Sequence, residues 1–122
     1  MIACGLYENK RLLHVHPISP LQKADFEEMA RKVDPFIGNE GSLNGLVIEA
    51  KDFPGWESFG AMVEHFKFIR SHHAHIKRVA LVTDSRLGDV AERLGSHFVS
   101  AEIRHFQADQ HEEADQWASG IQ

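Results

Sequence analysis

Two kinds of hydrophobic spacing alternate along the chain. Short apolar runs typical of strands occur at 2–7, 11–16, 43–50, 78–83 and within 98–106. Apolar residues recur at helical spacing in 19–35, 56–72, 85–95 and 109–119. This alternation predicts an α/β fold with a mostly parallel central sheet, flanking helices and right-handed crossovers.

The first two strands are expected to form an N-terminal hairpin. Only Glu8-Asn9-Lys10 separates them, which is short enough for a hairpin connection. In the second strand, alternation puts Leu13 and Val15 on one side and His14 and His16 on the other.

Two continuous apolar runs predict the centre of the sheet. They are Leu46-Val47-Ile48 and Val79-Ala80-Leu81-Val82. Strands buried on both faces have continuous apolar runs of this kind, so these two are expected to be adjacent, parallel and central.

The helix of 19–35 carries recognisable boundary residues. Ser19 can cap it, Pro20 suits its first turn, and Gln22 can close a capping box. Pro35 is expected to end or kink it, because proline lacks the amide hydrogen that a helix interior uses.

The helix of 56–72 is expected to bury its largest apolar side chains. Those side chains are Phe59, Met62, Val63, Phe66 and Ile69. Further along, Asp84 or Ser85 can cap the helix of 85–95.

Length and composition favour one domain, residues 1–122, of ordinary globular character. The chain has 43% hydrophobic and 25% charged residues, and Cys4 is its single cysteine. One cysteine excludes an intramolecular disulfide and a cysteine-rich zinc module, which fits a cytoplasmic protein. No signal-peptide pattern is present, and the net charge of −5 disfavours a nucleic-acid partner.

Three segments resemble the SpoIIAA-like (STAS-like) family of small bacterial proteins. Residues 77–84, Lys-Arg-Val-Ala-Leu-Val-Thr-Asp, are similar to a strand motif of that family. Residues 52–56, Asp-Phe-Pro-Gly-Trp, resemble its Asp-Phe-x-Gly turn. Residues 101–106 followed by Glu113-Ala114 resemble its C-terminal pattern. The resemblance covers nearly the whole chain and implies a sheet of four or five strands, but little biochemistry.

The resemblance also bears on phosphorylation. STAS regulators carry a phosphorylated serine in an Asp-Ser-Ser/Thr-Gly element, and Glu57-Ser58-Phe59-Gly60 is the comparable stretch here. Ser58 is therefore a candidate phosphorylation site. Glu57 and Phe59 depart from the family's aspartate and hydroxyl residue.

The predicted ligand or partner site lies beyond the carboxyl ends of the two central strands, where open α/β sheets bind ligands. Its candidate residues are Asp52, Phe53, Trp56, Ser58, Asp84 and Ser85. Helix N-termini there offer free N–H groups, and aromatic loop residues often mark contact surfaces. The alternative is purely structural, with Asp84 and Ser85 as caps and Trp56 in the core.

Catalytic and metal motifs are absent from the sequence. There is no Gly-x-Ser-x-Gly elbow, phosphate-binding glycine loop or His-Glu-x-x-His. Nine histidines are present, including His72-His73-Ala74-His75, but a metal site would have to be assembled across elements. We expect no enzyme, metal or cofactor.

The sequence thus predicts a non-catalytic binding or regulatory module whose partner is a protein or a small ligand. Binding of a lipid or a small apolar ligand at a membrane surface is one alternative, which the acidic charge disfavours. An enzyme or histidine-based metalloprotein is the other. A homodimer is also expected, because small domains often cover exposed aromatic residues by self-association.

Overall fold

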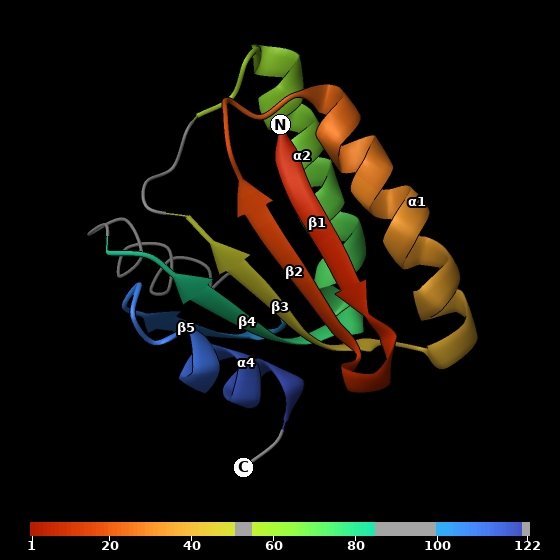
Figure 1. The fold of residues 1–122 in the computed structure, drawn as a ribbon. Helices are drawn as coiled ribbons and strands as arrows, with labels where there is room; N and C mark the ends of the chain where they lie inside the picture. Colours follow the sequence, from red (N-terminus) through yellow and green to blue (C-terminus); the bar gives the residue numbers. More distant parts are fainter. Residues whose placement is uncertain (51–54, 85–99, 121–122) are drawn as a thin grey trace.

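A five-stranded sheet forms the centre of the fold (Figure 1). The structure is a computed structural model that describes residues 1–50, 55–84 and 100–120. The strands follow in the order β1-β2-β3-β4-β5, and only the β1–β2 pair is antiparallel. Their bounds are β1 Ile2–Tyr7, β2 Leu12–Pro17, β3 Leu43–Glu49, β4 Ile76–Val82 and β5 Glu102–Phe106.

The prediction of a central, parallel β3–β4 pair is confirmed. Val47 lies opposite Ala80 in the register, and both are almost completely buried. The N-terminal hairpin is also confirmed, with a 3-10 turn at Glu8–Lys10 between its strands. Apolar side chains on both faces hold β3 in the middle of the sheet.

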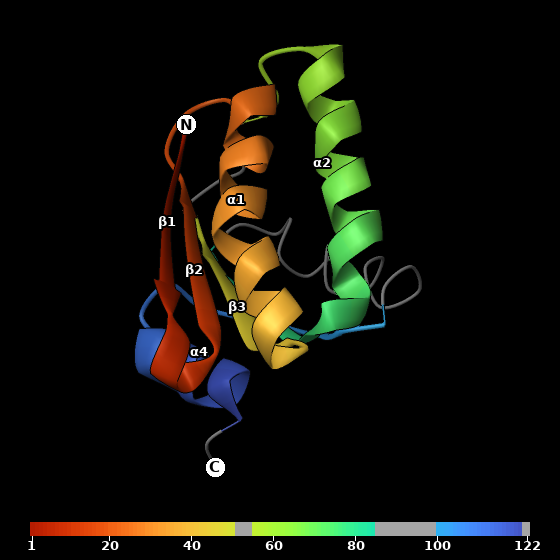
Figure 2. The same cartoon turned by 90° about the vertical axis from the view of Figure 1, so that its right-hand side faces the viewer.

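Helices cover the two faces of the sheet unequally. Helices α1 (Lys23–Glu40) and α2 (Phe59–His72) lie on one side, and α4 (His111–Ser119) lies on the other (Figure 2). Successive strand residues point to opposite faces of the sheet. Leu13 packs in the core between the sheet and α1, whereas Leu12 packs in the core between the sheet and α4.

The start of α1 differs from the prediction. Its N-cap is Gln22, which forms a reciprocal capping box with Asp25, so the helix begins later than Ser19 predicts. Ser19 instead accepts a hydrogen bond of 2.9 Å from the Met1 amine. Leu21 is held in an extended bridge with Trp56, which excludes it from the helix.

Pro35 lies inside α1, so the expectation that it ends the helix is wrong. The helix continues to Glu40 and ends at Gly41, whose φ of 89° favours glycine. Proline removes the hydrogen bond to the carbonyl of Arg31, four residues earlier. Arg31 and Pro35 are both exposed, so water can hydrate this carbonyl on the outer side of the helix.

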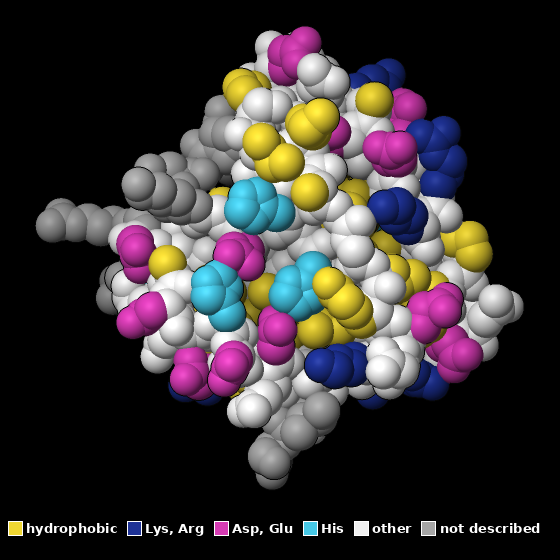
Figure 3. Space-filling model, viewed as in Figure 1, with side chains coloured by type: hydrophobic (Ala, Val, Ile, Leu, Met, Phe, Trp, Pro, Cys, Tyr) yellow, Lys and Arg dark blue, Asp and Glu magenta, His cyan; other side chains and the backbone are white. Residues whose placement is uncertain are grey.

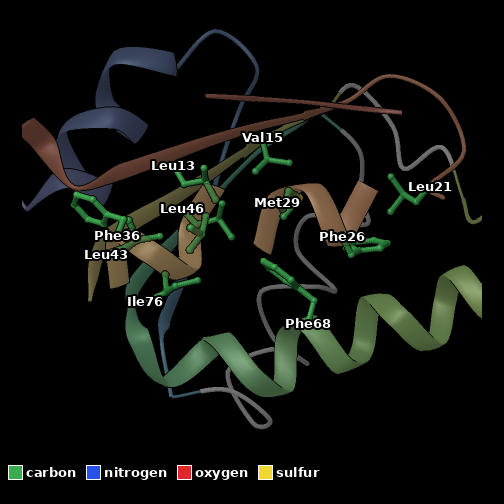
Figure 4. Close-up of a cluster of buried hydrophobic side chains, with 11 residues drawn as sticks. Leu13, Val15, Leu21, Phe26, Met29, Phe36, Leu43, Leu46, Phe68 and Ile76 are labelled. Carbon is green, nitrogen blue, oxygen red and sulfur yellow. The ribbon is translucent and has the colours of Figure 1, made fainter. Parts of the chain in front are cut away.

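The predicted inner face of α2 is also wrong. The structure buries Ala61, Phe68 and His72, while Phe59 and Phe66 are exposed. Contacts with α1 explain why this side of α2 is buried. Phe26 of α1 packs against the rings of His65 and Phe68 of α2. Figure 4 shows Phe68 projecting from α2 toward α1, and its ring centroid lies 6.2 Å from that of Phe26.

A buried histidine extends this packing. His72 Nε2 lies 2.6 Å from Asp34 Oδ1, and its ring stacks on Phe68 at 4.0 Å. The imidazole thus joins the two helices while its polar atoms keep partners. The predicted helix of 85–95 lies outside the described residues.

Gly45 on β3 permits the close approach of α4, and its replacement tests that contact. An added Cβ would lie 2.7 Å from Ala118 Cβ and closer still to the Ala118 carbonyl. We predict that Gly45→Ala lowers the free energy of unfolding by about 3 kcal/mol or more, because the helix must move. Urea unfolding measures this loss.

Gly38→Ala is the matched control. Gly38 lies inside α1 with open space around its Cα, so alanine should leave stability unchanged or raise it by about 0.5–1 kcal/mol. Equal stability of the Gly45→Ala variant and the wild type would contradict the tight contact between α4 and β3.

Candidate functional site

The structure describes half of the residues predicted for the site. Trp56, Ser58 and Asp84 are described, whereas Asp52, Phe53 and Ser85 lie outside the described residues. Those three therefore remain predictions from the sequence.

Trp56 joins the beginnings of α1 and α2. Its Nε1 donates a hydrogen bond of 3.1 Å to His65 Nδ1, and its ring meets Phe66 edge-on at 5.9 Å. Backbone hydrogen bonds on both sides of Trp56 reach Leu21, at 2.7 Å from Gly55 and 2.8 Å from Glu57. Trp56 is half-buried: part of its ring packs against the hydrophobic core, as the structural alternative expects, and part is exposed to solvent.

Ser58 is the N-cap of α2. Its Oγ accepts a hydrogen bond of 3.1 Å from the amide of Ala61, while the residue itself stays exposed. The hydroxyl therefore satisfies one of the free amides at the helix start.

Asp84 lies elsewhere. Its Oδ1 accepts a hydrogen bond of 2.9 Å from the amide of Ala108, which ties the end of β4 to the loop after β5. In Figure 1 the end of β4 is well separated from the start of α2. The structure therefore does not bring Asp84 and Ser58 together.

An exposed apolar surface begins next to Ser58. It consists of the side chains predicted to be buried, and we call it the exposed α2 face: Phe59, Met62, Val63, Phe66 and Ile69. Phe59 is 76% exposed, Phe66 53% and Ile69 36%, and Met62 and Val63 are half-buried. The sequence signal was present as an apolar stripe, but it marks the outer side of the helix.

Basic side chains border this face. Lys67 and Arg70 are both exposed on α2, although the whole chain has a net charge of −5. Glu64 lies 3.7 Å from Lys67 and offsets part of its charge. The surface therefore combines aromatic contact area with local positive charge.

His65 lies between the exposed face and the core. It stacks on Phe26 with ring centroids 4.9 Å apart and accepts the hydrogen bond from Trp56. Burial lowers the pKa of His65 to about 4, because the charged imidazole loses water there. A neutral ring at pH 7 suits its role as an acceptor.

Histidines and carboxylates gather on the opposite face of the sheet (Figure 3). His14 Nε2 lies 3.0 Å from Asp115 Oδ1, as an ion-pair contact without an aligned hydrogen bond. His111 Nδ1 lies 3.2 Å from Glu49 Oε1. His16 and Glu49 border a shallow depression of about 240 Å³.

These side chains form pairs only. Within residues 1–50, 55–84 and 100–120, no three His, Cys, Asp or Glu side chains are placed to hold a metal ion. Alternation in the sequence identified His14 and His16, but it could not show which α4 residues would face them.

Among the helices that the structure describes, none is both long enough and apolar enough to cross a bilayer.

The buried His65 predicts a stability loss in acid. Its pKa rises from about 4 in the folded chain to its ordinary value of 6.5 on unfolding, so the unfolded state binds the additional proton. The contribution of neutral His65 to the free energy of unfolding is present above pH 6.5 and is lost as the pH drops toward 4, by on the order of 3 kcal/mol. Urea unfolding across this range measures it.

His65→Phe is the control, because it keeps the stacking on Phe26 and removes the titrating ring. The stability of this variant should fall less between pH 7 and pH 4. Identical pH dependence in both proteins would show that His65 is not buried in its neutral form.

The Ser58 cap makes a separate prediction. Ser58→Ala should cost about 1 kcal/mol because the amide of Ala61 loses its acceptor, whereas Ser58→Asp should keep the cap. Thermal unfolding of the two variants measures the difference. Equal melting temperatures would contradict the capping role.

Comparison with known proteins agrees with the fold. None of the curated proteins matches the chain. The crystal structure of an uncharacterised DUF3478-family protein with a SpoIIAA-like fold, from Shewanella loihica PV-4, matches with a TM-score of 0.75. The match has 21% sequence identity and covers 97% of this chain and 92% of the other, so it shows the fold alone. The SpoIIAA-like family model matches residues 12–119. The chain therefore belongs to the SpoIIAA-like family.

Proposed function

We propose that this protein is a non-catalytic module that binds a partner protein through the exposed α2 face. The observation that carries the proposal is the 76% exposure of Phe59 beside the 53% exposure of Phe66 on one helix. Large aromatic side chains are enriched in the cores of protein interfaces, where a few residues carry most of the binding energy. Leaving them in water has a free-energy cost that burial in a complex would remove.

The spacing of the face fits a helical partner. Phe59, Val63, Phe66 and Arg70 recur at intervals of four and three residues along α2. This spacing forms one straight stripe on a helix, which is the form that an amphipathic helix packs against.

Charge supports an acidic partner. Lys67 and Arg70 border the apolar side chains, so carboxylates beside the apolar stripe of the partner would be attracted. We therefore propose an amphipathic helical segment with acidic flanks as the occupant. Trp56 and Ser58 lie at the beginning of this surface, and Asp52 and Phe53 precede them in the chain.

We also propose a regulatory role for Ser58, which its position at the start of α2 supports. A phosphate there would sit at the start of α2, where the helix dipole stabilises negative charge. It would also place that charge next to Phe59, at the start of the exposed α2 face, so phosphorylation should weaken partner binding because a charged, hydrated group would have to be desolvated beside an apolar anchor.

The test compares variants of exposed residues that leave the core intact. Phe59→Ser/Phe66→Ser removes the proposed anchors, whereas Tyr7→Ser removes an exposed aromatic side chain on β1, which is not part of the exposed α2 face. Proteins captured from the host by each are quantified, and a candidate partner is then purified and titrated by calorimetry. We expect the α2 variant to bind it at least about 10-fold more weakly, because an interface anchor contributes 2 kcal/mol or more.

Two results would contradict the proposal. One is equal affinity of the purified partner for both variants. The other is binding of the wild type, but not the α2 variant, to vesicles of phosphatidylcholine and phosphatidylserine, which would assign the face to a lipid surface. Circular dichroism controls for folding.

A further inference from the structure

The outer edge of β1 carries no charge and no proline. Its sequence is Ile-Ala-Cys-Gly-Leu-Tyr, and it is the terminal strand of the sheet order. Soluble proteins usually protect such an edge with charged residues, proline or a bulge, because unpaired amides and carbonyls attract another strand.

The opposite edge strand shows the protected form. β5 carries Glu102 and Arg104, both exposed, within five residues. The two edges of the same sheet therefore differ in their own side chains, and those of β1 leave the edge open to pairing except at the Cys4 carbonyl, which Lys32 covers.

The register shows which groups of β1 face outward. Ile18 donates to the carbonyl of Met1, so residues 1, 3, 5 and 7 exchange hydrogen bonds with β2 in the antiparallel pattern. Ile2, Cys4 and Leu6 therefore direct their amides and carbonyls away from β2. Lys32 Nζ confirms this direction, because it donates to the Cys4 carbonyl at 2.9 Å.

We propose that the β1 edges of two copies pair antiparallel about a two-fold axis at Cys4, giving one continuous sheet across a homodimer. Ile2 would pair with Leu6 of the second copy, and Cys4 with Cys4 of the second copy. The pairing needs no new side-chain pocket, because Ile2, Cys4 and Leu6 already pack against the core of their own copy.

Charges beside the edge are self-complementary. Glu28 and Lys32 lie one turn apart on α1. Burial raises the pKa of the Cys4 thiol, while the Lys32 charge lowers it and the Glu28 charge raises it, so both charges lie near Cys4. Helix α1 runs in the same direction as β1 (Figure 1). A two-fold axis reverses this direction in the second copy, so Lys32 of each copy faces Glu28 of the other. In the dimer, Lys32 would release the Cys4 carbonyl to the Cys4 amide of the second copy and pair with the Glu28 carboxylate of that copy instead.

Sedimentation and amide exchange test the proposal together. We expect a concentration-dependent dimer in which the amides of Cys4 and Leu6 exchange at least about 10-fold more slowly than in dilute solution. The amides of Ala3 and Gly5, already bonded to β2, serve as internal controls and should not change. This alternating protection is specific to the β1 edge.

A pair of variants isolates the outward amide. Leu6→Pro removes that donor without touching the hydrogen bonds to β2, and Leu6→Ala removes the same side chain but keeps the donor. Leu6→Ala should dimerise and Leu6→Pro should be monomeric, with circular dichroism showing that both fold. A wild type that stays monomeric at several hundred micromolar overturns the proposal. So does a dimer whose Cys4 and Leu6 amides exchange freely, or one that survives Leu6→Pro.

Discussion

The stacking of rings between α1 and α2 decides which side of α2 faces water. Phe26 of α1 stacks on His65, and Phe68 stacks on His72, which Asp34 holds from the other helix. Once this side is committed to α1, the opposite side carries Phe59 and Phe66 outward. The proposed recognition surface is therefore a consequence of how the two helices pack, and it depends on imidazole rings that are buried with their partners.

This packing also links the surface to the charge of one residue. Trp56 donates to His65, and both contact Phe66 on the outer side. A proton on His65 Nδ1 would remove the acceptor and place charge in a buried site. The β1 edge lies on the far side of α1 from α2 in Figure 2, so a dimer through β1 leaves the exposed α2 face open.

The sequence predicts the sheet better than it predicts the helix faces. Continuous apolar runs identify β3 and β4, because residues buried on both faces leave no other pattern. The α2 prediction failed because the inner stripe contains His65 and His72. Histidine is polar, so a hydrophobic pattern does not count it as buried, and the sequence does not show the aromatic rings on which these two stack. The expectation that Pro35 ends α1 failed because the free-energy cost of a proline inside a helix depends on whether the carbonyl that loses its hydrogen bond, here that of Arg31, can reach water. Asp84 and Ser58 follow adjacent strands, yet the length and direction of α2 separate them in space.

The orientation of α2 can be measured directly with fluorine NMR of a fluorophenylalanine-labelled protein, using a soluble paramagnetic gadolinium chelate to broaden exposed rings. The signals of Phe59 and Phe66 should broaden strongly, whereas those of Phe26 and Phe68 should stay sharp, because the latter are less than a tenth exposed. Single Phe→Leu variants assign the signals. Sharp signals from Phe59 and Phe66 beside a broadened Phe68 would show the reverse orientation of α2 and contradict the proposed surface.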